Sequence, residues 1–315
     1  MISRRLIRVK VLQILYAYHQ SDDKSIITYE KELYRSLHKT YDLYYLLILM
    51  LIEVRRYAED RIDIARNKKL PTKEDLNPNT RFIDNKLIEQ LRNNKAFQTY
   101  LAENKLSWAD HKDLVRRIYN NFRDTDFYQK YMTAPENSYK NDRSVLVQLL
   151  EKIILRNEHF QQTLEDMSIY WNDDLEYITS MVVKTLDITK EGDKDTKPLL
   201  PLFKNQDDED YTKTLFRKTI AGNDEFNKLI DTFTANWELD RIAFMDILIM
   251  HMAFAEMMEF PSIPIKVTLN EYIEIAKQYS TDKSGVFVNG ILDKAVQSLK
   301  TDGRIVKTGR GLLEN

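Results

Sequence analysis

Cysteine is absent from all 315 residues, which excludes disulfides, thiolate nucleophiles and cysteine-based zinc or iron–sulfur sites. Glycine is scarce: the chain has seven, and the first of them is Gly192. A glycine-rich phosphate-binding loop therefore cannot lie upstream of that residue, and the remaining glycines form no nucleotide-binding pattern. The long glycine-free stretches are rich in Leu, Ile, Lys, Glu, Gln and Arg, so the sequence predicts an all-α fold.

Long hydrophobic runs and an excess of either charge are also missing. The longest apolar run, residues 43–52, has ten residues, whereas a membrane-spanning helix needs ~20. No cleavable small-residue site follows the charged N-terminus, so we expect a cytoplasmic protein with no membrane partner. The net charge of −2 gives no overall field that would attract nucleic acid, and any basic binding site must therefore be local.

Polar and proline-containing segments divide the first 210 residues. Ser3 is placed to cap the first helix, because its hydroxyl can accept a hydrogen bond from a free N–H of the first turn. A polar connector at the end of this region is the strongest candidate for a domain boundary. The expected helical stretches are 4–20, 29–66, 86–131 and 144–187, with a proline-containing loop at 67–85 and the connector at 191–210.

The C-terminal third has sharper helix signals. Pro261 is expected to stop one helix, because proline cannot donate to the helical ladder. Thr268 and Glu271 have the spacing of a capping box for the next helix, and Ser284 is placed to cap the last one. Helices are expected at about 211–221, 223–236, 240–258, 268–279 and 284–299, followed by a flexible tail at 301–315.

Four motifs carry a resemblance to a known family. An Arg-rich turn that runs into a helix of the type RxxAxQxLY is met by Arg4, Arg5, Arg8 and the residues Val11-Leu12-Gln13-Ile14-Leu15-Tyr16. The pattern W-x-x-x-R-[LI]-A-x-x-D-x-x-[IL] is met by Trp237, Arg241, Ile242, Ala243, Asp246 and Ile249. The pattern P-x-K-V-x-[IL]-N-E-x-[IV]-E-[LI]-A-K-x-[FY] is met from Pro264 to Tyr279, and FVNG-[IV]-LDK is met from Phe287 to Lys294. In this order the chain resembles the NusB family of bacterial transcription antitermination factors.

The resemblance covers roughly 1–20 and 211–300, and it implies a multi-helix bundle. In that division, 1–20 is an Arg-rich first helix of the RNA-binding core, 211–300 is the NusB-like helical domain, and 21–210 adds helices of open role. The resemblance also implies a function. NusB-like proteins bind boxA-type single-stranded RNA with the small-subunit ribosomal protein that doubles as NusE, within an RNA polymerase antitermination complex that prevents premature termination in ribosomal RNA operons.

The first constellation with binding chemistry is the cationic N-terminal turn. Arg4, Arg5 and Arg8 come before any acidic residue, and cations at a helix N-terminus oppose the helix dipole. A chain selected only for stability would place Asp or Glu there. We therefore expect these guanidinium groups to contact phosphates, although a solvated basic start would look the same. Arg5→Glu or Arg8→Glu is expected to weaken RNA binding without unfolding the chain, whereas Ile249→Asp should unfold it.

The second constellation is aromatic and lies around the TDKSG loop. Single-stranded RNA is read by splaying bases onto aromatic faces while cations hold the phosphates. The resemblance implies this use for Tyr16, Tyr279 and Phe287, with Lys283 and Ser284 in the loop. Lys283 stands where many family members carry Asp, so we expect either that RNA binding is stronger and less selective or that the contacts of the loop differ. Most Tyr and Phe side chains of the chain must be core, and Phe287 could also simply pack.

Signals for catalysis are weak. The five histidines form no HExxH motif and no close pair, and His251 lies in an apolar helix where a core position is the plainer interpretation. The NusB-like domain also heads ribosomal RNA cytosine methyltransferases, but those need a catalytic cysteine, which this chain lacks. We therefore expect no enzyme, no cofactor and no metal. The alternative to an RNA-binding factor is a helical scaffold that binds another protein through 21–210, with incidental RNA binding.

Overall fold

The computed structural model describes residues 1–234 and 242–312, and within these residues it contains helices and no strand, as the sequence predicts. The chain forms two compact units. One comprises Met1 and residues 38–202, and the other comprises residues 2–37 and 203–315. The long helix α2 (Ile26–Arg66) contributes its first turns to the second unit and the rest to the first unit.

The predicted division placed 21–37 and 203–210 in the additional helical region, whereas the structure assigns both to the unit that holds the C-terminal helices. The contacts of these segments explain the difference. Arg217 of α11 (Gln206–Ala221) forms an ion pair with Glu30, and the rings of Tyr34 and Phe203 lie 6.4 Å apart. Helix α11 also begins five residues earlier than expected, because Asn205 caps it.

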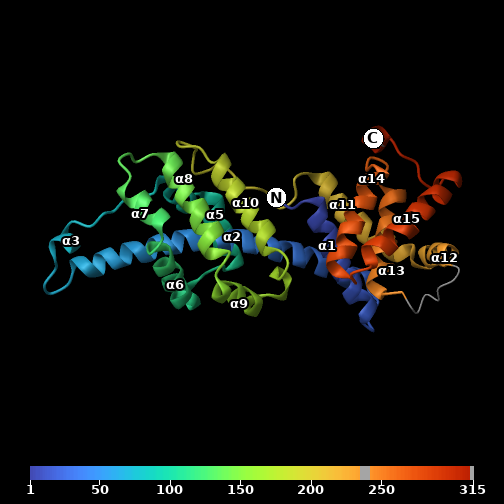
Figure 1. Cartoon of the computed structure of the whole chain (residues 1–315), viewed down its shortest axis with the longest axis horizontal. Helices are drawn as coiled ribbons and strands as arrows, with labels where there is room; N and C mark the ends of the chain where they lie inside the picture. The colour runs from blue at the N-terminus through green and yellow to red at the C-terminus, as the bar shows by residue number, and fades with distance from the viewer. Residues whose placement is uncertain (235–241, 313–315) are drawn as a thin grey trace. The chain divides into compact units, whose positions relative to one another are not determined.

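The first unit is built around the apolar part of α2. Residues 43–52 are buried, which confirms a buried helix for the longest apolar run. The indole N–H of Trp108 donates to the carbonyl of Leu46 over 2.9 Å, so a side chain also contacts the backbone of α2 at this point. The other elements of this unit in chain order are α3 (Lys73–Leu76), α4 (Lys86–Arg92), α5 (Lys95–Asn104), α6 (Lys112–Arg123), α7 (Asp126–Thr133), α8 (Tyr139–Gln148), a π-helical turn (Leu149–Ile154), α9 (Glu158–Met167) and α10 (Leu175–Ile188) (Figure 1).

The predicted connector is ordered over its first part. The backbone N–H of Lys95 donates to the carbonyl of Asp195 over 2.9 Å. The side-chain amide of Asn94 donates to the backbone carbonyl of Lys197 over 2.7 Å. The hydroxyl of Tyr41 donates to the carbonyl of Leu200 over 2.8 Å. Residues 195–200 therefore pack on the first unit, and the boundary between the units follows at 202.

The second unit is arranged around α13 (Phe244–Glu259), which is apolar on nearly all sides and almost entirely buried. It packs against α1 (Arg4–Gln20), α11, α12 (Asn223–Phe233), α14 (Ile265–Tyr279) and α15 (Ser284–Thr301) (Figure 1). Ile249 at its centre is fully buried. This arrangement places the ends of α13 next to the first turns of α1, α14 and α15.

One predicted helix start and one predicted helix end are confirmed, and two predicted helix caps are wrong. Ser3 accepts from the N–H of Leu6 over 3.3 Å, and α13 ends at the residue before Phe260, as Pro261 requires. By contrast, α14 begins three residues before Thr268, with no side-chain cap. Ser284 likewise caps no N–H of α15, and it is the first residue of that helix. In both cases the hydroxyl donates instead to a buried carboxylate of α13.

The start of the expected flexible tail packs against the second unit. The N–H of Thr308 and the ammonium of Lys307 donate to the carbonyls of Pro261 and Phe260, each over 3.0 Å. Ile305 is buried. A Cβ at Gly311 would lie 1.9 Å from the carbonyl oxygen of Pro261, so only glycine fits this close approach. Residues 303–312 therefore form an ordered strap over the loop that follows α13.

Candidate functional site

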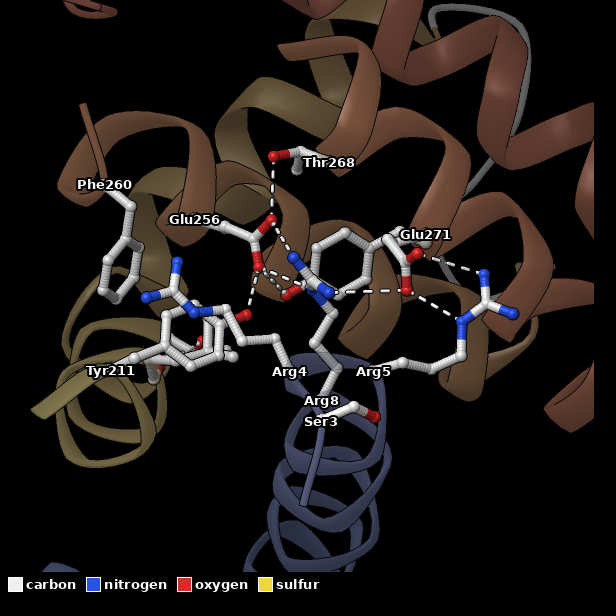
Figure 2. A network of polar contacts seen from close by, with 12 residues as sticks. Ser3, Arg4, Arg5, Arg8, Tyr211, Glu256, Phe260, Thr268 and Glu271 are labelled. Atoms are coloured by element: carbon white, nitrogen blue, oxygen red, sulfur yellow. Dashed lines mark hydrogen bonds and ion pairs between the residues drawn. The ribbon is translucent and has the colours of Figure 1, made fainter. Parts of the chain in front are cut away.

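The three N-terminal arginines each meet a carboxylate of another helix. Arg4 pairs with Asp208 of α11 over 2.9 Å, and Arg5 makes a two-pronged contact with Glu271 of α14 over 2.9 and 3.1 Å. Figure 2 shows the contact of Arg5 with Glu271 beside the first turn of α1. The arginines that oppose the dipole of α1 are thus compensated by acids that lie far away in sequence.

Arg8 is the most deeply placed of the three, with 3% of its side chain exposed. Its guanidinium forms a fork with both carboxylate oxygens of Glu256 over 2.7 and 2.8 Å, and it lies 3.4 Å from Glu271 (Figure 2). A buried fork of this kind leaves no donor surface for an RNA phosphate. The expected phosphate contact at Arg8 is therefore corrected to a structural ion pair, and Arg8→Glu should unfold the chain, because it would bury two carboxylates together.

Both carboxylate oxygens of Glu256 accept hydrogen bonds from several donors. Besides Arg8, it accepts from the hydroxyls of Tyr211, Tyr272 at 3.2 Å and Thr268 at 2.8 Å (Figure 2). Burial alone would raise the pKa of this carboxyl, but the bonds and charge of Arg8 and the hydroxyl donors outweigh burial and lower the pKa. Burial, followed by the negative charge of Glu256, raises the pKa of both tyrosines well above its usual value. The network joins α1, α11, α13 and α14 through one ionised carboxylate.

A second group of expected site residues meets at the opposite end of α13. Lys283 directly precedes α15, and Ser284 and Phe287 lie one turn apart on that helix, so their side chains share a face. They line a cavity of about 210 Å³ together with residues at the start of α13. The partners from that side are Ile242, Ala243 and Asp246. The structure thus brings together three of the residues that the sequence selected for RNA binding.

Asp246 also lines this cavity, although its sequence pattern was not interpreted as that of a site residue. Its side chain is 4% exposed, and its Oδ2 accepts from the hydroxyl of Ser284 over 2.8 Å. Its Oδ1 is buried and has no hydrogen-bond partner within the described ranges. The sequence did contain a signal, because an acidic motif residue among the apolar residues of a core helix needs a partner. Sequence spacing alone could not show that Ser284, at a separation of 38 residues, donates to only one of the two carboxylate oxygens of Asp246.

The aromatic residues divide between two positions. Tyr16 is 42% exposed, and its ring lies 5.9 Å from that of Phe244, which directly follows the cavity residue Ala243. His19 lies 5.6 Å from the same ring, and burial lowers its pKa. Tyr279 is half-buried at the end of α14 and does not line the cavity. Tyr16 and Phe244 therefore form a pair of partly exposed rings, and neither of them lines the cavity.

Among residues 1–234 and 242–312, no three acidic, histidine or cysteine side chains gather as metal ligands, and no helix is long and apolar enough to span a bilayer. His251 is buried, as expected for a core residue, and its Nε2 lies 3.0 Å from the amide oxygen of Asn227. Burial lowers its pKa to about 4. The motif residues Trp237 and Arg241 lie outside the described residues.

Comparison with known proteins identifies similar sequences. The model of the NusB family matches residues 140–297, which is half of the chain. The match begins in α8, so it takes in α8 to α10 as well as the helices from α11 onward, and it reaches further upstream than the motifs quoted from the sequence. It also includes every residue that lines the cavity.

Individual relatives agree with the family match. The transcription antitermination protein NusB of Salinibacter ruber is 40% identical over 138 residues, which cover 42% of this chain and 86% of the relative. The NusB of Chloroherpeton thalassium is 37% identical, with 44% and 66% covered, and that of Natranaerobius thermophilus is 35% identical, with 30% and 68% covered. A solved structure of T. maritima NusB is 26% identical over 49% of this chain and 89% of its own, with a TM-score of 0.29.

Proposed function

Because this chain belongs to the NusB family, whose named relatives are transcription antitermination proteins, we propose that it binds boxA-type single-stranded RNA together with a NusE-type small-subunit ribosomal protein. The complex would act at RNA polymerase in the cytoplasm and prevent premature termination in ribosomal RNA operons. The protein is a non-catalytic adaptor in this proposal. The observation that carries it is the cavity in which Lys283, Ser284 and Phe287 meet, within the segment that the family model matches.

The chemistry of this region suits a single strand of RNA. Phe287 supplies an aromatic wall, and the exposed rings of Tyr16 and Phe244 lie 5.9 Å apart, so unstacked bases have faces on which to stack. Lys283 is exposed and forms no ion pair with any described residue, which leaves its ammonium available for a phosphate. Bases and phosphate thus find different partners on one surface.

The remaining expected RNA contacts lie further away along α1. Twelve residues separate Arg4 from Tyr16, which is about 18 Å at the rise of an α-helix. The side chain of Arg5 is 55% exposed despite its contact with Glu271, and that of Arg4 is partly exposed. We propose that these two arginines give secondary phosphate contacts, and that Tyr279 gives a contact only if α14 and the loop after it rearrange.

The test is an electrophoretic mobility shift with boxA-type RNA and a scrambled RNA, with and without the NusE-type protein. Selective binding that the partner strengthens supports the proposal. Lys283→Gln should lower affinity and reduce the slope of log K against log salt by about 0.7, which corresponds to one phosphate contact on a single strand. Lys228→Gln is the matched control, because Lys228 is an exposed lysine of α12 that does not line the cavity.

A protein-interaction scaffold with incidental RNA binding is the second candidate. Exposed apolar side chains in the first unit favour it: Ile64 near the end of α2, Leu70 in the following loop and Leu76 in α3, with Leu70 89% exposed. Where exposed apolar side chains form one contiguous patch, that patch marks a protein interaction surface. Failure of the folded protein to shift either RNA, with the NusE-type protein present, would favour the scaffold over the antitermination factor.

A further inference from the structure

The carboxylate of Asp246 is held in place and only half satisfied. Its Oδ2 accepts from Ser284, whose hydroxyl oxygen also accepts from the N–H of Thr281 over 3.1 Å. Rotation of the Asp246 carboxylate would therefore break its bond to Ser284. The other oxygen, Oδ1, is buried, has no partner in the described residues, and belongs to a side chain that lines the cavity.

Stability explains only part of this arrangement. An acidic residue in the first turn of α13 interacts favourably with the helix dipole, and its bond to Ser284 fixes the loop. Neither effect accounts for the bare oxygen, because a buried acceptor without a partner destabilises the fold by about 1–3 kcal/mol. Unsatisfied buried groups are rare in folded proteins, and a ligand that supplies the missing donor is one physical reason to keep one.

The other residues that line the cavity indicate which chemical group would carry the missing hydrogen-bond donor. Phe287, Ile242 and Ala243 give the cavity an aromatic and aliphatic lining, Thr281 adds a hydroxyl, and Lys283 adds an exposed cation. A planar, largely apolar group that carries one N–H donor and is linked to an anion would satisfy all of these features. A nucleobase with an exocyclic amine, joined to its phosphate, has this chemistry.

Resting on the proposed RNA-binding function, we propose that Asp246 is the specificity-determining residue of this cavity, and that it selects a base with an exocyclic amine, such as cytosine, over uracil. The N4 amine of cytosine donates to Oδ1, while Phe287 covers a face of the ring. Uracil has the same size but presents its O4 oxygen at that position. Two acceptors would then face each other, and the buried oxygen would stay unsatisfied.

Ser284 is a positioning residue in this scheme. By donating to Oδ2 it leaves Oδ1 as the only free acceptor and fixes its direction. Lys283 contributes affinity through the phosphate and does not contribute to the choice of base. The two functions are therefore separable by mutation, which makes the proposal testable.

The experiment compares a short oligouridine with a matched set of RNAs in which a single uridine is replaced by cytidine at successive positions. Fluorescence anisotropy with the full chain gives a Kd for each RNA. At one position, cytidine should bind on the order of tenfold more tightly than uridine. Asp246→Asn, which keeps the shape of the side chain, should abolish or reverse this ratio, because its amide can turn a donor toward the base. Ser284→Ala should reduce the ratio by freeing the carboxylate to rotate.

The outcomes separate this inference from the proposed function. Binding that depends on Phe287 but shows no cytidine preference in the wild type would overturn the role of Asp246 and leave the proposed function intact. Equal weakening of all RNAs by Asp246→Asn, with the ratio preserved, would mean a purely structural role and would also overturn it. Absence of binding to every RNA, with the protein folded, would reject the proposed function together with this inference.

Discussion

The two ends of α13 each bury a carboxylate, and the two carboxylates differ in how completely they are satisfied. Glu256, near the C-terminal end, accepts from Arg8 and from three hydroxyl groups. Asp246, near the N-terminal end, accepts from Ser284 alone and has one oxygen without a partner in the described residues. Glu256 is enclosed by side chains of three other helices, α1, α11 and α14, whereas Asp246 borders a cavity.

The difference shows how one helix can serve both the fold and a binding site. A buried charge that is fully paired connects the elements around it, and removing one partner leaves the other uncompensated. A buried acceptor that is only partly paired weakens the fold, and in the proposed complex a ligand supplies the missing donor. Four predictions test this distinction, in order of decreasing expected effect.

Glu256→Gln should destabilise the protein by about 3–5 kcal/mol, because it leaves the buried guanidinium of Arg8 without a counter-charge. Urea unfolding followed by circular dichroism measures the loss. Glu259→Gln on the same helix is the control, since its ion pair with Lys218 lies at the surface and its removal should cost under about 1 kcal/mol. Similar losses in the two variants would mean that Glu256 does not hold the four helices together.

His251, which lies between the two carboxylates on α13, should make the stability depend on pH. Burial lowers its folded pKa to about 4, whereas an unfolded histidine titrates near pH ~6.5. The neutral folded form is therefore favoured above pH ~6.5, and stability should fall by roughly 3 kcal/mol as the pH drops from there toward about 4. His251→Gln should lack this part of the loss. Parallel stability profiles for wild type and variant between these pH values would contradict the assignment.

Phe287→Ala should weaken RNA binding by about 1–3 kcal/mol, which is the usual loss when a base loses its aromatic partner. A mobility shift or anisotropy titration gives the change in Kd. Val286→Ala is the neighbouring control, because Val286 is exposed and does not line the cavity. If both substitutions leave RNA affinity unchanged while the protein stays folded, the N-terminal end of α13 is not the RNA-binding end.

Asp246→Asn should change the stability least, by less than about 1 kcal/mol in urea unfolding. The charge that it removes has an unsatisfied oxygen, and the amide oxygen can still accept from Ser284. The same experiment on Glu256→Gln provides the comparison. A loss at Asp246 as large as that at Glu256 would erase the distinction between the two ends of the helix.

The sequence was sufficient wherever the deciding interactions are local. Glycine-poor apolar stretches predicted the helices, Ser3 and Pro261 marked where α1 begins and α13 ends, and the C-terminal motifs identified the family. The cavity residues Lys283, Ser284 and Phe287 could be grouped in advance, because five consecutive residues at a helix start keep their side chains near one another.

The tertiary structure decided everything that depends on partners distant in sequence. Arg8 resembles a free phosphate ligand in the sequence, but it is neutralised by Glu256, 248 residues away. Thr268 and Ser284 have the pattern of helix caps, but their hydroxyls serve the carboxylates of α13. Local propensity fixes a helix, since its bonds join neighbours along the chain. The partner of a charged or hydroxyl side chain is fixed only when packing brings distant helices together, because a buried polar group bonds with whichever donor or acceptor is then within reach.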